Sequence, residues 1–151
     1  MVPKRNLRRC LMVLAGVLAV SACGGSSAAS PSPSPGIDFT MKAQNGSGVS
    51  GTGQILTAAG SFVVTIKLTG MAPNSSHISH LHAGTCAAPG GIAYALQQVI
   101  ADSTGAATAT TTVPATYTVP GSGWYVNVHH GPDFTEAGYA PSDSCGDLST
   151  T

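Results

Sequence analysis

The chain has 151 residues, only 8% of them charged, and its six Lys and Arg balance its six Asp and Glu. Four of the six basic residues lie within residues 4–9, so the rest of the chain has two lysines against six acidic residues, a net charge of −4. A nucleic-acid binder needs clustered Lys or Arg to replace phosphate counterions, so this distribution argues against one. The length suits one domain, and the abundance of Gly, Pro, Ser and Thr favours strands and turns over helices.

Residues 1–22 have the three parts of an export signal. A basic segment, Lys4 to Arg9, precedes an apolar segment, Leu11 to Val20, which ends at the small residues Ser21 and Ala22. A helix needs about twenty apolar residues to span a bilayer, and this segment is half that length. Residues 1–22 are therefore predicted to be a signal peptide.

The cysteine after this segment is a candidate for lipidation. Val20-Ser21-Ala22-Cys23 resembles a bacterial lipobox, in which the cysteine is lipidated and becomes the first mature residue. The alternative is a secretory peptide cut near Ala22, with Cys23 left as a free thiol. Because a Ser/Pro/Gly linker follows directly, we expect a lipoprotein signal peptide (1–22), lipidated Cys23 with a linker (23–36), and a folded domain (37–151) held at the membrane on the extracytoplasmic side.

The domain is predicted to consist of short strands. Residues 61–69 alternate Phe62, Val64, Ile66 and Leu68 with more polar residues, the pattern of a half-buried strand. Further strands are expected at residues 37–43, 53–57, 77–83, 107–113 and 124–129. Residues 92–101 could also form a helical face, but their Gly-Gly start and local alternation favour a strand. Spaced short strands indicate an antiparallel all-β sandwich or barrel.

Two cysteines remain in the exported domain. Cys10 leaves with the signal peptide and Cys23 carries the lipid, so Cys86 and Cys145 are left as a pair. A disulfide is expected in an oxidising compartment. Two thiolates on a metal are the alternative, but they lack the close spacing of zinc sites.

The five histidines all lie between residues 77 and 130. In the strand at 124–129, Tyr125, Asn127 and His129 alternate with apolar residues, and Leu81 separates His80 from His82. Strand alternation therefore predicts that His80, His82 and His129 lie on faces away from the core, where they could converge on Cu or Zn. Solvated surface histidines are the common alternative for so short a motif.

These motifs together resemble the copper/zinc superoxide dismutases and the related CHRD (chordin-like) domains. The resemblance covers residues 37–148 and rests on His80-Leu81-His82-Ala83-Gly84-Thr85-Cys86, Trp124-Tyr125-Val126-Asn127-Val128-His129 and Cys145-Gly146-Asp147-Leu148. It implies a Greek-key β-sandwich or barrel, copper held by His80, His82 and His129, and a Cys86–Cys145 disulfide. The Tyr-x-Asn-x-His pattern of Tyr125, Asn127 and His129 is more similar to CHRD domains.

Departures from the dismutase pattern limit what the resemblance implies. No histidine lies between Cys86 and His129, so a second site for zinc is not expected. Residues 141–144 lack the arginine that attracts superoxide in the enzymes, and Asp143 and the net charge of −4 would repel an anion. A fourth copper ligand would be His130 or His77, although strand alternation places both on the inward side.

Two functions from different classes follow. The first is a surface-anchored copper protein in which a redox-active metal would turn over superoxide by alternating its oxidation state, so enzyme activity is left open. The second is a non-enzymatic CHRD-like module in which His80, His82, Tyr125 and Asn127 form a polar surface or a hydrogen-bond network for a protein or envelope partner. A Ser-His-Asp hydrolase is discounted, because no Gly-x-Ser-x-Gly motif is present.

Overall fold

A computed structural model describes residues 36–148, so the predicted signal peptide, Cys23 and the linker before residue 36 lie outside the described residues. The described part consists of strands and one short 3-10 helix, with no helix long and apolar enough to cross a membrane. The elements are β1 (Ile37–Ala43), β2 (Ser50–Ala58), β3 (Ser61–Thr69), β4 (Ser76–His77), β5 (Ser79–Gly84), β6 (Pro89–Ala95), β7 (Val99–Ile100), β8 (Ala107–Val113), β9 (Trp124–His129), η1 (Ala137–Tyr139) and β10 (Ser142–Leu148).

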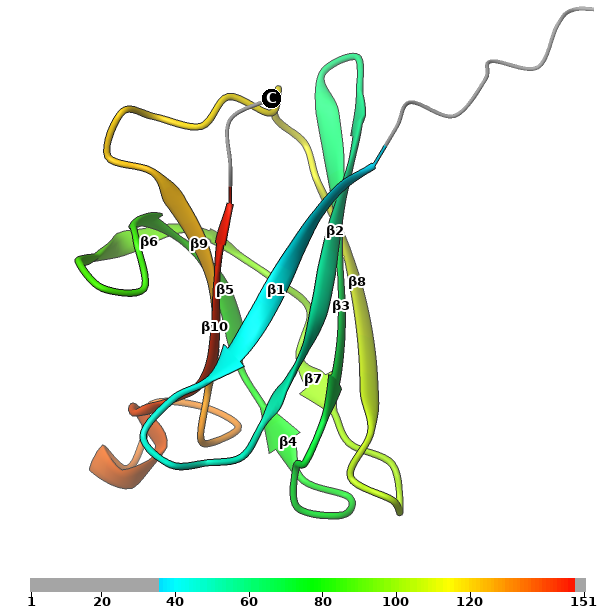
Figure 1. Cartoon of the computed structure of the whole chain (residues 1–151), viewed down its shortest axis with the longest axis vertical. Coiled ribbons are helices and arrows are strands. Elements are labelled where there is room, and N and C mark those ends of the chain that lie inside the picture. The colour runs from blue at the N-terminus through cyan, green and yellow to red at the C-terminus, as the bar shows by residue number, and fades with distance from the viewer. Residues whose placement is uncertain (1–35, 149–151) are drawn as a thin grey trace, which may run out of the picture. The chain divides into compact units, whose positions relative to one another are not determined.

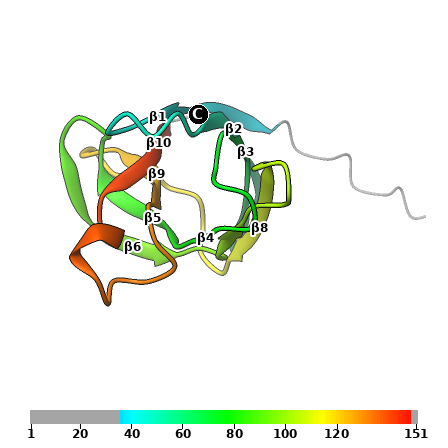
Figure 2. The same ribbon diagram turned by 90° about the horizontal axis from the view of Figure 1, so that it is seen from below.

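Eight of these strands form one antiparallel sheet in the order β6-β5-β9-β10-β1-β2-β3-β8, and β4 pairs separately with β7 (Figure 1). Viewed from below, the sheet curls around a central core (Figure 2). Its edge strands β6 and β8 are not paired to each other, so the barrel is open on one side. The predicted all-β antiparallel class with non-consecutive, Greek-key-type neighbours is confirmed.

Strand β3 shows why the alternating segments were predictable. Phe62, Val64, Ile66 and Leu68 are each at most 2% exposed and form part of the core. The intervening residues face outward, and both edges of the strand are hydrogen-bonded, to β2 and to β8. The predicted bounds of β1, β3, β8 and β9 match the structure, whereas β2 is longer because its pairing with β3 continues from Ser50 to the turn at Gly60.

Two predicted strands are interrupted. The segment 77–83 breaks at Ile78, because His77 pairs with Val99 in the small sheet while Ser79–Gly84 joins the main sheet. The segment 92–101 is a strand, as preferred over a helix, but it divides into β6 and β7. Between these two strands the backbone is held by Leu96, whose N–H donates to the Ser79 carbonyl at 3.0 Å.

Strand β10 was not predicted, yet it lies between β9 and β1 in the middle of the sheet. It carries Cys145, which forms the expected disulfide with Cys86, with their Cα atoms 5.9 Å apart. The Cys86 N–H also donates to the Asp147 carboxylate at 2.7 Å. The disulfide therefore ties the loop after β5 to the central strand that neighbours β9.

Candidate metal centre

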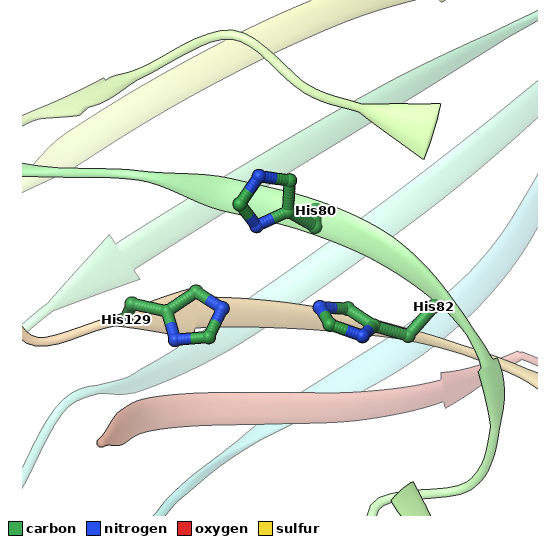
Figure 3. Close-up of side chains that lie close together, drawn as sticks. All are labelled: His80, His82 and His129. Atoms are coloured by element: carbon green, nitrogen blue, oxygen red, sulfur yellow. The ribbon is translucent and has the colours of Figure 1, made fainter. Parts of the chain in front are cut away.

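Two adjacent strands bring three histidines together on one face of the sheet. His80 and His82 lie on β5 and His129 on β9, and the register pairs His80 with Asn127 and His82 with Tyr125. Leu81, between the two β5 histidines, is fully buried in the core. One nitrogen from each imidazole lies within 4.8 Å of the other two, as Figure 3 illustrates. The predicted convergence of His80, His82 and His129 is what the structure shows.

Backbone carbonyls fix which ring nitrogens carry protons in two of these histidines. His82 Nδ1 is 3.1 Å from the Gly90 carbonyl and His129 Nδ1 is 2.7 Å from the Ala140 carbonyl. A carbonyl only accepts, so in the neutral rings Nδ1 donates and Nε2 keeps its lone pair. Each of these two residues thus directs an unprotonated Nε2 away from its backbone partner.

The cluster contains two buried nitrogens without a hydrogen-bond partner. They are His82 Nε2 and His80 Nδ1. A buried polar atom left unpaired costs about 1–3 kcal/mol, so such atoms are rare and call for a ligand. A metal ion coordinated by imidazole nitrogens would satisfy both at once, so the donor set fits a metal.

Burial also favours the neutral form of His80 and His129. Desolvation, followed by the nearby His129 and His82 rings, lowers the pKa of His80 to about 4. Desolvation is likewise the main reason that the pKa of His129 is lowered, although its bond to the Ala140 carbonyl acts in the opposite direction. Both rings therefore present lone pairs at neutral pH, the form in which histidine binds metals.

The lone pair of the third nitrogen, His129 Nε2, already accepts a hydrogen bond from Asn127. Its Nδ2 lies 3.1 Å from His129 Nε2 and donates to it, while its Oδ1 accepts a short hydrogen bond from the Ser142 hydroxyl. A metal bound to His129 Nε2 must replace this hydrogen bond. Asn127 is 7% exposed and Tyr125 is 4% exposed, so of the two roles expected from the sequence their contacts agree with a network around the histidines and not with an exposed surface.

Aromatic rings enclose the cluster on two sides. Tyr125 stacks on His82, with centroids 5.0 Å apart and an angle of 23° between the rings. Phe134 stacks on His80 at 5.7 Å and 11°, and meets His129 edge-on at 4.9 Å. Sequence analysis did not identify Phe134, because it lies in the loop between β9 and β10, where no periodicity indicates the position of a side chain.

The two candidate fourth ligands lie outside the cluster. His77 is buried as predicted, but its Nδ1 is 2.9 Å from the backbone carbonyl of His129. His130 was predicted to point inward, whereas its side chain is 62% exposed and its Nδ1 lies 3.0 Å from the Asp143 carboxylate. Asp143 is itself 5% exposed and also lies 3.4 Å from His77 Nδ1, so its carboxylate contacts both of these histidines.

The surroundings of His77 include a Ser-His-Asp row. Ser75 Oγ is 2.7 Å from His77 Nε2, and Asp143 lies beyond Nδ1. However, the Ser75 hydroxyl is also 2.6 Å from the Ala72 carbonyl, and Nδ1 is closer to the His129 carbonyl than to Asp143. We therefore interpret these contacts as structural, because they join β4, β9 and β10.

A cavity of about 300 Å³ opens beside the cluster. His82, His129, Tyr125 and Asn127 line it together with the disulfide, and within residues 36–148 no Lys, Arg, Asp or Glu contributes to its wall. A small molecule could approach the imidazoles from this side. The cavity offers that molecule hydrogen bonds but no cationic group.

Comparison with known proteins was made at the levels of sequence and structure. No protein-family model and no curated protein matches the sequence. Two solved structures share the fold. A SOD-like protein from Bacillus subtilis superposes with a TM-score of 0.59 and 15% identity over 74% of this chain and 97% of that chain. The Cu/Zn superoxide dismutase from Brucella abortus superposes with a TM-score of 0.57 and 17% identity over 76% of this chain and 100% of that chain. The chain therefore has a superoxide dismutase-like fold with a histidine cluster that could bind a metal.

Proposed function

We propose that this chain is an exported lipoprotein whose superoxide dismutase-like domain binds one copper ion through His80, His82 and His129. The observation that carries the proposal is the convergence of three imidazole nitrogens within 4.8 Å, two of them buried without a hydrogen-bond partner. Both cysteines of the domain are in a disulfide, so imidazole is the donor available, and imidazole suits copper. Copper held there would supply one-electron redox chemistry.

The proposal places the domain outside the cytoplasm, anchored through lipid on Cys23. The Cys86–Cys145 disulfide is compatible with export, because such bonds persist in oxidising compartments. The anchor rests on the signal-like residues 1–22 and on the lipobox-like Val20-Ser21-Ala22-Cys23. Two acyl chains on the cysteine would keep the domain at the membrane.

Superoxide turnover is expected to be slow. The chain has no arginine after Arg9, and the domain contains two lysines but six acidic residues. The cavity beside the cluster has no cationic residue in its wall. Because steering of an anion depends on positive potential at the site, copper binding is the primary function that we propose, with dismutation a minor activity.

Copper titration of the purified domain, residues 36–151 with the disulfide formed, tests the proposal. We expect one copper per chain and electron paramagnetic resonance features of nitrogen ligands. The His80→Ala, His82→Ala double variant should lose both, while His130→Ala, which alters a histidine outside the cluster, should retain them. Unchanged binding in the double variant would contradict the proposal.

The alternative is a CHRD-like module that binds an envelope partner without metal. The burial of Tyr125 and Asn127 does not favour a partner surface formed by these residues. A domain that takes up no stoichiometric copper, and that has no superoxide turnover above that of free copper, would support this alternative over the copper site.

A further inference from the structure

None of the described acidic side chains contacts a nitrogen of the histidine cluster. Imidazole is a neutral ligand, and the acidic residue nearest in the chain to His129, Asp133, accepts hydrogen bonds at Oδ1 from the backbone N–H and hydroxyl of Thr135. Asp143 contacts His77 and His130, which lie outside the cluster, although its charge also acts on the His129 ring. A metal ion bound by the cluster would therefore have no carboxylate ligand to neutralise its charge directly.

The cluster is also poorly solvated. His80 Nδ1 and His82 Nε2 are inaccessible to water, Tyr125 covers His82, and Phe134 covers His80 and His129. Transferring an ion from water to a site of low dielectric constant has a cost that grows with the square of its charge, so a divalent ion costs about four times as much as a monovalent one. Where these rings cover it, the site thus penalises Cu²⁺ more than Cu⁺.

The number of protein ligands agrees with this preference. Three imidazoles can complete the shell of Cu⁺, whereas Cu²⁺ prefers a tetragonal shell and would require water or an anion as a further ligand. The side from which that ligand could come is the cavity of about 300 Å³, whose wall has no Lys or Arg to hold an anion. Phe134 is not among the residues that line this cavity, and its ring lies over two of the imidazoles.

The fold holds the Phe134 ring over the cluster although much of the ring is exposed. It is 50% exposed, which for a phenylalanine leaves much apolar surface in water. The loop that carries it is held at both ends, since Gln98 Nε2 donates to the Pro132 carbonyl at 3.2 Å and His129 Nδ1 donates to the Ala140 carbonyl at 2.7 Å. These hydrogen bonds therefore keep the ring over the cluster.

From these contacts we infer that the site is selective for the cuprous ion and that Phe134 contributes to this selectivity by excluding water and small anions from the side of the metal that the cavity does not reach. The inference rests on the proposed copper site and specifies the oxidation state that the site retains. Such a domain would bind Cu⁺ at the cell envelope more tightly than Cu²⁺.

The experiment measures affinity for both ions in the disulfide-intact domain. Cu⁺ is titrated without oxygen against a chromophoric chelator, Cu²⁺ is titrated in air, and azide is added to the Cu²⁺ form as a probe of access. Replacing the ring with a small side chain in Phe134→Ala should lower the Cu⁺ to Cu²⁺ affinity ratio about tenfold, the usual size of an effect from the shell around a metal. This corresponds to a fall of about 59 mV in the one-electron potential. Azide should bind the variant about tenfold more tightly than it binds the wild type.

Two further variants make the result specific. Ile100→Ala removes a comparably exposed apolar side chain, 64% exposed on β7, and should leave the ratio and azide affinity unchanged. Phe134→Leu keeps an apolar cover without the ring, so it should give a smaller shift and serves as the test if Phe134→Ala does not fold. A wild type that binds neither ion overturns the copper site itself. A wild type that binds Cu²⁺ as tightly as Cu⁺, or Phe134 variants with unchanged ratio and azide affinity, overturns the selectivity while leaving the copper site in place.

Discussion

The three clustered histidines differ in what contacts their ring nitrogens. In His82 and His129 a backbone carbonyl holds Nδ1, which fixes the tautomer and leaves Nε2 for a ligand. In His80 the free nitrogen is Nδ1, which is buried and unpaired. His129 Nε2 alone has a protein partner, the amide of Asn127. The energetics of the site thus depend on a few single contacts that can be altered one at a time.

Replacing Asn127 should strengthen metal binding. Asn127→Ala removes the hydrogen bond that a metal must displace from His129 Nε2, and a net hydrogen bond contributes about 1 kcal/mol, or about fivefold in affinity. Competition with a chelator measures the change. Gln54→Ala, which removes an exposed amide bonded to Asp38 on the opposite part of the sheet, is the control. Weaker binding in Asn127→Ala would show instead that the amide orients His129 for the metal.

The lowered pKa of His80 makes the stability of the metal-free domain depend on pH. In the unfolded chain His80 titrates near 6.5, whereas its pKa in the folded domain is about 4. Between these values the unfolded state binds more protons, so the free energy of unfolding is highest above pH 6.5 and falls as the pH is lowered towards 4. His129, whose pKa is lowered as well, adds to the slope.

Thermal unfolding of the metal-free protein at pH 7 and pH 4.5 measures this dependence. The wild type should lose several degrees in Tm between the two values. His80→Gln, which cannot titrate, should lose fewer. An equal loss in the two proteins would contradict the assignment of the proton uptake to His80.

At the scale of elements, the site depends on one β-strand pair and one loop. Strands β5 and β9 set the spacing of the imidazoles, and the loop between β9 and β10 brings Phe134 over them. This loop packs closely at its base, where the Gly131 N–H donates to the Tyr139 carbonyl at 3.2 Å. A Cβ on Gly131 would lie 2.1 Å from Tyr139 Cγ and 2.2 Å from its Cβ, and side-chain rotation cannot move the latter.

Gly131→Ala should therefore displace the loop. We expect a loss of about 1–3 kcal/mol in the free energy of unfolding, the usual cost of overpacking, and weaker copper binding as Phe134 and the Ala140 carbonyl shift. Gly138→Ala in the same loop is the matched control, because no atom lies within 4 Å of its added Cβ. Denaturant unfolding and copper competition on both variants test this. Equal behaviour of the two variants would show that the loop base can relax without cost.

The elements also show what sequence analysis could and could not provide. Alternation alone identified β3, which buries every second side chain in the core, and it separated the apolar face of β9 from the face that carries Tyr125, Asn127 and His129, although all six residues of β9 are buried. Strand β10 has no such pattern, since Ser142, Asp143, Ser144 and Gly146 have low β propensity. It is a strand because both of its neighbours pair with it, and Gly146 fits there because a Cβ would lie 2.7 Å from Met41 Sδ.

The parts of the site that escaped prediction are the non-local ones. The tautomers depend on carbonyls of Gly90 and Ala140, each in a segment apart from the strand that bears the histidine. The roles of His77 and His130 depend on Asp143, which the unpredicted β10 places between them. Short motifs locate candidate ligands, whereas the contacts that select among them are set by the packing of distant segments.

At the scale of the whole molecule, the domain is an open barrel that relies on a covalent link near its site. The edges β6 and β8 remain unpaired, so closure of the sheet does not contribute. The disulfide joins residues 59 apart in sequence and connects the loop between β5 and β6 to β10. In the sheet, β5 and β9 thus separate the unpaired edge strand β6 from β10, to which this loop is bound. We expect the disulfide to support both the edge and the wall of the cavity beside the histidines.

Removing the disulfide should therefore be the most destabilising of these changes. Cys86→Ala, Cys145→Ala should lower the free energy of unfolding by about 4 kcal/mol, as chain entropy predicts for a loop of about sixty residues. Trp124, the single tryptophan and 8% exposed, reports unfolding in urea by its fluorescence. Reduced wild-type protein is the control for the substitutions, and it should lose a similar amount. A loss below about 1 kcal/mol in both would mean that the pairing of β10 with β1 and β9 suffices without the bond, because the unfolded chain would then gain little freedom from its absence.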